Sequence, residues 1–262
     1  MEIVGRVSKG SRMDQVYIPK QRSGFAVGSY VVLRSLVEPL EKRSLYYYHV
    51  NDLEPVKVTI IQRVMDEIEQ SSGGCENCIV MGSFLDKGFF FNDVDVLVVD
   101  GVETDRKGIE DRLRKSLGIR VHLHVLSQKK LRHCLSVDPM YQVMLSRCVT
   151  RKRFLYKVKK KVEYKVLDLY LLKSEVLIEN FEFLSGNEKY DLVRNMIAID
   201  LFLKSDKVSR SSVDKEIERV FSVRIRDLKK NLVEKRSFLK IFRKKYEKTF
   251  NAVLNHSKNG SE

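Results

Sequence analysis

Two aspartates, Asp93 and Asp95, stand at the start of a segment that is otherwise apolar as far as Val99. Alternate side chains of a β-strand point to the same face, so the two carboxylates project together. Two like charges add nothing to the packing of an apolar strand, and burying them is costly unless a cation lies between them. Mg²⁺ is the simplest such cation, because it binds carboxylate oxygens together with the phosphate oxygens of a substrate. The pair therefore predicts a strand with a Mg²⁺ or Mn²⁺ site at its start, and Asp93 and Asp95 as the metal ligands. The plainer alternative is a pair of carboxylates near a turn that Asn92 caps locally.

A second motif, Met81-Gly82-Ser83, is separated from Asp93 by nine residues. The apolar run that ends at Met81 predicts a buried strand, so Gly82 and Ser83 follow a strand end. A glycine there lets backbone N–H groups approach phosphate oxygens closely, and the serine hydroxyl adds a donor. We therefore assign Gly82 and Ser83, with Lys87 in the same loop, to a predicted phosphate-binding set.

The segments around these motifs predict an α+β unit. Pro55 suits the first turn of a helix, and apolar residues follow it at helical spacing. A second helix is expected over 103–117, and strands over 78–81, 94–99 and 120–126.

The two motifs, on elements in this order, resemble the nucleotidyltransferase superfamily that includes DNA polymerase β, and most closely its small, minimal prokaryotic members. The resemblance covers residues 55–127. It implies that Gly82 and Ser83 hold the phosphates of a nucleoside triphosphate, with ATP expected, while Asp93 and Asp95 bind two metal ions. It also implies transfer of a nucleoside monophosphate to an acceptor hydroxyl, with pyrophosphate leaving. RNA 3′ ends, protein hydroxyls and small-molecule hydroxyls are all open as acceptors.

One position departs from that family. A third carboxylate is expected on the strand after the second helix, and this chain has His122 there. Three interpretations are open. In the first, His122 is a metal ligand or a general base, since a neutral imidazole accepts a proton near pH 7. In the second, a loop carboxylate (Asp100, Glu103 or Asp105) replaces the missing acid, and in the third the site binds nucleotide without turnover. The last case would make the protein a nucleic-acid-binding or regulatory module. A histidine ligand predicts that Mn²⁺ supports activity better than Mg²⁺ does.

Residues 1–50 are expected to form a separate β-rich module. Ile18 is biased toward extended backbone by Pro19, and Gly28 leads into a strand over 30–33. This pattern resembles the AbrB-type swapped-hairpin domain over residues 4–35, which implies a module that forms a homodimer or binds DNA. The alternative is a small β-cap packed on the next domain.

A nucleotidyltransferase domain is then expected over 51–135 and a basic helical domain over 136–262. Residues 151–165 carry eight basic and one acidic side chain, a net +7, and residues 222–262 carry twelve and four, a net +8, in a chain of formal charge +14. Such charge attracts polyanions, although a solvated lysine-rich helix face is the alternative. The predicted contacts to nucleic acid or the acceptor are Arg151, Arg153, Lys157, Lys160 and Lys161.

Periodicity predicts a helical region from about residue 157. We expect one long helix that includes 167–181 and ends near Ser185-Gly186, a second over 190–202, a shorter one after Ser211-Ser212, and a long basic one from about 224 to 255. Helical projection places Lys157, Lys160 and Lys161 on one side.

The predicted fold class is therefore α+β, with a central mixed sheet between a small β-rich module and a helical domain. No run of 18 apolar residues is present and the first residues lack the apolar stretch of a signal peptide, so we expect no membrane partner and a cytoplasmic protein. Four cysteines in 262 residues do not make a disulfide framework.

Overall fold

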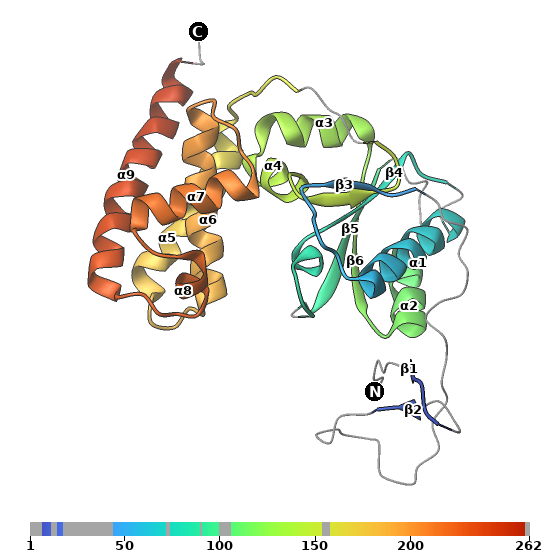
Figure 1. Cartoon of the computed structure of the whole chain (residues 1–262). Helices are drawn as coiled ribbons and strands as arrows, with labels where there is room; N and C mark the ends of the chain where they lie inside the picture. The colour runs from blue at the N-terminus through green and yellow to red at the C-terminus, as the bar shows by residue number, and fades with distance from the viewer. Residues whose placement is uncertain are drawn as a thin grey trace.

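The structure is a computed structural model that describes residues 7–11, 15–17, 44–71, 74–89, 91–99, 106–153 and 158–259. It confirms the α+β class, because a five-stranded mixed sheet with its helices is followed by a bundle of helices (Figure 1).

The sheet has the strand order β3-β7-β4-β5-β6. Its strands are β3 (Tyr46–Tyr48), β4 (Asn77–Met81), β5 (Asp93–Val99), β6 (Arg120–Leu126) and β7 (Cys148–Thr150). β5 and β6 run parallel, and every other neighbouring pair is antiparallel. The three strands predicted for the central unit, β4, β5 and β6, are confirmed and lie side by side.

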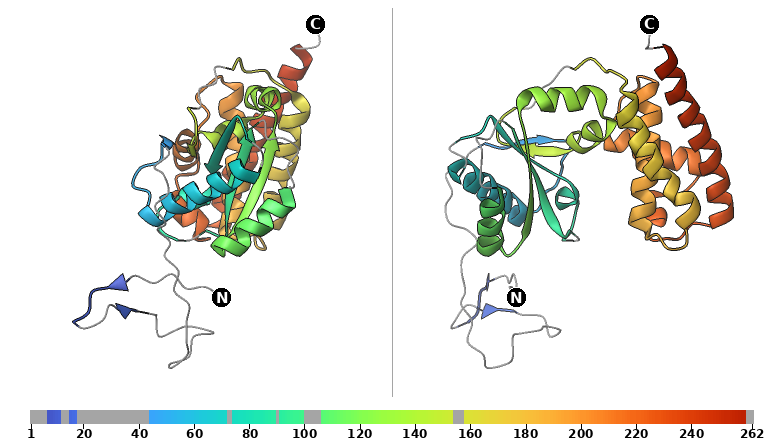
Figure 2. Two further views of the ribbon diagram at one scale, coloured as in Figure 1. Left: turned by 90° about the vertical axis from the view of Figure 1, so that its right-hand side faces the viewer. Right: turned by 180° about the vertical axis from the view of Figure 1, so that it is seen from behind.

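Helices cover both faces of this sheet. α1 (Pro55–Ser71) and α2 (Arg106–Leu117) pack on the face that includes Val80, Val96 and Leu123. α3 (Gln128–Val137) and α4 (Pro139–Leu145) pack against the opposite face, on Ile79, Leu97 and neighbouring residues. Alternation along each strand therefore divides the core into two layers, and α1 and α2 lie on the side away from the bundle (Figure 2).

The sheet extends beyond the predicted bounds of 51–135. β3 comes from the region assigned to the N-terminal module, and β7 from the region assigned to the helical domain. Each strand has three residues, too few for alternation to show in the sequence. The segment that includes α3 and α4 was likewise not predicted, although Ser127 and Asp138 cap these helices by accepting from Lys130 N and Met140 N.

The C-terminal bundle contains α5 (Tyr164–Asn180), α6 (Gly186–Leu203), α7 (Arg210–Phe221), α8 (Ile225–Lys229) and α9 (Lys235–Asn259). The first three agree with the predicted helices. The prediction of one long basic helix over 224–255 is wrong, because the chain turns between α8 and α9. Asn231 adopts a left-handed backbone with φ 63°, and the Glu234 carboxylate accepts from Ser237 N at 2.6 Å, which starts a new helix.

The region before α5 also differs from the prediction. Residues 158–163 are not helical, so the helical projection of Lys160 and Lys161 onto one side does not apply. The main-chain N–H of Lys161 instead donates to the carbonyl of Ser136 at 2.9 Å, which ties this connection to α3. Lys157 lies outside the described residues.

Near the N-terminus, β1 (Val7–Ser8) and β2 (Gln15–Val16) form a two-stranded antiparallel sheet. Most of the segment that carries the resemblance to AbrB-type domains, including Ile18, Pro19, Gly28 and the predicted strand over 30–33, lies outside the described residues. None of the helices in the described part of the chain combines the length and the apolar composition needed to cross a lipid bilayer.

Candidate active site

The register of the central strands brings the two sequence motifs to one end of the sheet. Met81, the last residue of β4, is paired with Asp95 on β5, and Asp95 is paired with His122 on β6. Gly82 follows directly after β4, and Asp93 is the first residue of β5. Three adjacent strands therefore place Gly82, the two aspartates and His122 together, as the sequence predicts.

Asp93 and Asp95 lie on the same face of β5 and are half-buried, with side chains 26% and 31% exposed. Burial raises the pKa of Asp95 above its usual value, and the neighbouring charge of Asp93 raises it further. The site thus holds two like charges in a partly dry position, where a bound cation would be stabilising.

His122 faces both aspartates. Its Nδ1 atom lies 3.6 Å from Oδ2 of Asp93 and 3.9 Å from Oδ1 of Asp95. These separations exceed hydrogen-bond length, and the imidazole is half exposed. His124 also projects from the exposed face of β6, and both histidines lower the pKa of Asp95.

Gly82 is required by the geometry of the site. Its φ of 85° is a conformation that side-chain-bearing residues rarely adopt, and a Cβ atom there would lie 2.3 Å from Oδ2 of Asp95. Any larger residue would displace the carboxylate. The backbone of the Gly-Ser motif therefore runs directly beside the candidate metal ligands.

The donor set fits a divalent cation that is shared with a substrate. Among the described residues, no group of three or more His, Cys, Asp or Glu side chains is arranged to hold a metal ion alone. Two carboxylates on one face, beside a glycine backbone, suit Mg²⁺, which keeps few protein ligands and takes the rest from phosphate and water.

A buried lysine fixes the loop that follows Gly82. Lys57 on α1 is fully buried, its Nζ atom lies 3.1 Å from Oε2 of Glu54, and it donates to the main-chain carbonyl of Asp86. Oε1 of Glu54 accepts from Gly88 N at 2.7 Å, and this bond is the first cause that lowers the pKa of Glu54 to about 2. Lys57 was not singled out from the sequence, although it precedes Ile60, Ile61 and Val64 at helical spacing on the buried face of α1.

The same loop is attached to the helical bundle through Asp86. Its carboxylate accepts from Arg147, which follows α4, and from Nη2 of Arg210, the first residue of α7, at 3.0 Å. Burial alone would raise the pKa of Asp86, but Arg210 and Arg147 together lower it. We call these three side chains the Asp86 junction. No local pattern could predict it, because 61 and 124 residues separate the partners.

The remaining predicted site residues fall into two groups. Ser83 begins the short 3-10 helix η1 (Ser83–Leu85), and both Ser83 and Lys87 are exposed on the loop beside the aspartates. Arg151 and Arg153 lie away from the two aspartates, because they follow β7 at the sheet end opposite Gly82. Arg151 is buried, bonded to Asp66 and to Glu69 Oε1, and Arg153 lies over the Tyr46 ring at 5.7 Å. Their contact with nucleic acid or an acceptor stays a prediction.

Compared with known proteins, the chain matches no protein-family model and no curated protein sequence.

Proposed function

We propose that the protein is a metal-dependent nucleotidyltransferase that moves a nucleoside monophosphate from a nucleoside triphosphate to an acceptor hydroxyl. The observation that carries the proposal is the convergence of Asp93, Asp95, His122 and the Gly82 backbone on one end of three adjacent strands. The resemblance of the two motifs to the nucleotidyltransferase superfamily supports the same conclusion.

Each group has a role in this proposal. The backbone after Gly82, with the Ser83 hydroxyl and the Lys87 ammonium, binds the β- and γ-phosphates. Asp93 and Asp95 hold the divalent ions, which when bound offset the negative charge of the phosphoryl group and its attacking and leaving oxygens. His122 takes the place of the family's third carboxylate, where its imidazole would either ligate one of these ions or accept the proton of the attacking hydroxyl.

A second candidate is nucleotide binding without turnover. It is favoured by one observation, the half-exposed imidazole of His122 at the position where the family has a carboxylate. The two candidates share the binding site and differ only in transfer.

Transfer of label from α-³²P-ATP to a single-stranded RNA oligonucleotide distinguishes them. We expect transfer in Mn²⁺, weaker transfer in Mg²⁺, and loss of at least about a hundredfold in Asp93→Asn, since metal-mediated charge stabilisation supplies several kcal/mol. Asp111→Asn, an exposed acid on α2, is the matched control and should be unchanged. Nucleotide binding without transfer in either metal would support the second candidate, and no nucleotide binding would contradict both.

A further inference from the structure

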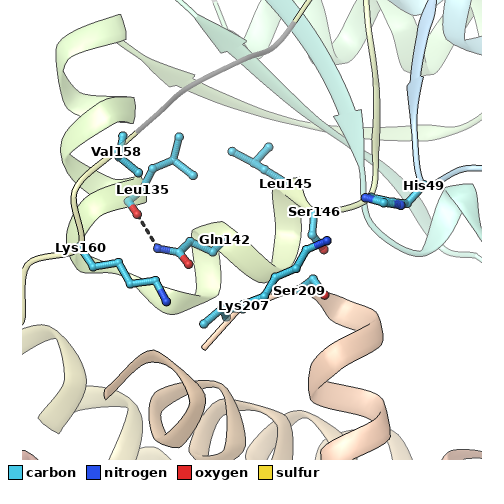
Figure 3. A pocket seen from close by; sticks show the side chains of 10 residues that line it. His49, Leu135, Gln142, Leu145, Ser146, Val158, Lys160, Lys207 and Ser209 are labelled. Atoms are coloured by element: carbon cyan, nitrogen blue, oxygen red, sulfur yellow. Dashed lines mark hydrogen bonds between the residues drawn. The ribbon is translucent and has the colours of Figure 1, made fainter. Parts of the chain in front are cut away.

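The junction between the sheet and the bundle contains a cavity of about 450 Å³. Lys160 approaches it from the connection before α5, while Lys207 and Ser209 come from the segment before α7 (Figure 3). Ser146 at the end of α4, which lies beside Ser209, and His49 after β3 also line it. None of the described residues that line the cavity is acidic, and its two charged side chains, Lys160 and Lys207, are both cationic.

The cationic side chains retain donors for a ligand. Lys160 gives one of its three N–H groups to the main-chain carbonyl of Asp206, which leaves two. Burial lowers the pKa of Lys160, and the nearby Asp206 charge only partly opposes this. Ser209 is the N-cap of α7, so the positive end of a twelve-residue helix also lies at the wall. An anionic group is the ligand that this lining fits.

The cavity lies at the same end of the sheet as the candidate active site but on different strands. His49 follows Tyr48, which is paired with Cys148, and Arg147 precedes Cys148, so both lie at the end that Gly82 occupies on β4. β3 is three strand positions from β5 in the sheet order. At the usual strand spacing, the end of β3, where His49 lines the cavity, lies roughly 14 Å from β5, which carries the two aspartates.

The Asp86 junction lies between the two places. Ser146 and Ser209 in the cavity wall are sequence neighbours of Arg147 and Arg210, and Ser146 Oγ accepts from the N–H of Arg210 at 2.9 Å. The cavity and the loop after Gly82 are therefore held in fixed relative positions.

We propose that this cavity binds a backbone phosphate of a single-stranded nucleic-acid acceptor, about four nucleotides from the hydroxyl that reacts. The inference rests on the proposed function, which places that hydroxyl beside Asp93 and Asp95. At a rise of about 3.4 Å per nucleotide of a stacked strand, a separation of roughly 14 Å corresponds to about four nucleotides. The excess of basic residues in the chain suits a polyanionic acceptor.

Fluorescence anisotropy with labelled single-stranded RNA tests the proposal, using Lys160→Gln/Lys207→Gln in the full chain. Lys240→Gln/Lys244→Gln, which removes two exposed lysines from α9, is the control for lost charge. For an octanucleotide we expect the cavity variant to bind about tenfold more weakly than the control, with a salt slope reduced by about 0.7 per lysine. For a dinucleotide, too short to span both places, the two variants should bind equally.

Equal binding of the octanucleotide by both variants would overturn the proposal. The proposal would also be overturned if the cavity variant lost as much affinity for the dinucleotide as for the octanucleotide. Inorganic phosphate is the second probe: loss of its binding in the cavity variant, with octanucleotide binding intact, would assign the cavity to a small anion and also overturn the proposal. Circular dichroism spectra and melting temperatures that match those of the wild type would establish that the variants are folded. Asp93→Asn distinguishes a failure of this proposal from a failure of the proposed function. It should remove transfer while leaving octanucleotide binding by the cavity unchanged.

Discussion

The contact between Gly82 and Asp95 is the tightest feature of the candidate site. A strand end and a strand start, separated by a nine-residue loop, meet with no room for a single methyl group. The sequence predicts both motifs because a glycine after an apolar run and two alternating acids are local patterns. It cannot predict how closely they meet, since that depends on the pairing of Met81 with Asp95.

Gly82→Ala tests this contact. The added Cβ would displace the Asp95 carboxylate, so we expect Mn²⁺-dependent nucleotide binding to fall by at least about tenfold, the loss of one charge-assisted contact. Calorimetric titration measures it. Gly74→Ala is the matched control, because Gly74 also has a positive φ, of 113°, but has open space around its Cβ position. If both variants bind nucleotide equally well, the close approach has no role in binding.

His122→Asp tests the position at which the chain departs from the nucleotidyltransferase motifs that it resembles. A carboxylate is a harder ligand than an imidazole, so this variant should shift the preference for supporting nucleotide binding or transfer from Mn²⁺ toward Mg²⁺. His124→Asp, which adds the same charge two residues further along β6, controls for electrostatic attraction alone. An unchanged ratio of the two metals in His122→Asp would show that His122 does not face the bound ion.

Helices and strands could be predicted from the sequence where they are long enough for apolar periodicity to appear. The helices α5, α6 and α7 and the strands β4, β5 and β6 carry clear apolar periodicity, and the structure has them where it was expected. Short elements such as β3 and β7 were missed. The break before α9 depends on the left-handed backbone of Asn231 and on the Glu234 cap, which an apolar pattern does not report.

A buried ion cluster links α6 to α9 within the bundle, and it gives a prediction for the stability of the protein. Asp200 on α6 is 4% exposed and accepts from Lys204 and from Lys245 on α9, each at 2.6 Å. Asp200→Ala should lower the free energy of unfolding by about 3 kcal/mol, because it leaves the amine of Lys245 buried without its partner. Urea denaturation measures the change. Asp191→Ala removes a surface pair with Arg194 and should cost less than about 1 kcal/mol.

The pH dependence of this difference follows from the pKa of Asp200. Burial alone would raise that pKa, but Lys204 and Lys245 together lower it. The stabilisation is therefore fully present above the unfolded value of about 3.9 and is lost as the pH falls through the lower folded value. We expect the gap between wild type and Asp200→Ala to narrow below about pH 4. A gap that stays constant to pH 2 would contradict this account of the cluster.

Two connections link the sheet to the helical bundle. α4 packs against α6 and α7, and the Asp86 junction links the loop after Gly82 to the same helices (Figure 1). Neither connection was predicted from the sequence, because each joins segments that are distant in the chain. The position of the candidate site at one sheet end was predictable, and its attachment to the bundle was not.

Asp86→Asn should loosen this attachment. The carboxylate is more than a third exposed, so solvent screens it and we expect a loss of only about 1 kcal/mol in stability. Hydrogen exchange should rise in residues 83–89 and at the start of α7, with less change elsewhere. The hydrogen bond from Lys57 should be unaffected, because Lys57 donates to the main-chain carbonyl of Asp86 and not to its carboxylate. Unchanged exchange at both segments would show that the junction does not hold the two parts together.

The central claim is that Asp93 and Asp95 hold divalent ions that accompany a nucleoside triphosphate. Calorimetric titration of a nonhydrolysable ATP analogue in Mn²⁺, with wild type and Asp93→Asn/Asp95→Asn, tests it most directly. We predict one nucleotide bound per chain in wild type, binding that disappears when Mn²⁺ is chelated, and no Mn²⁺-dependent binding in the double variant. Absence of binding to wild type, or equal binding by the double variant, would contradict the claim.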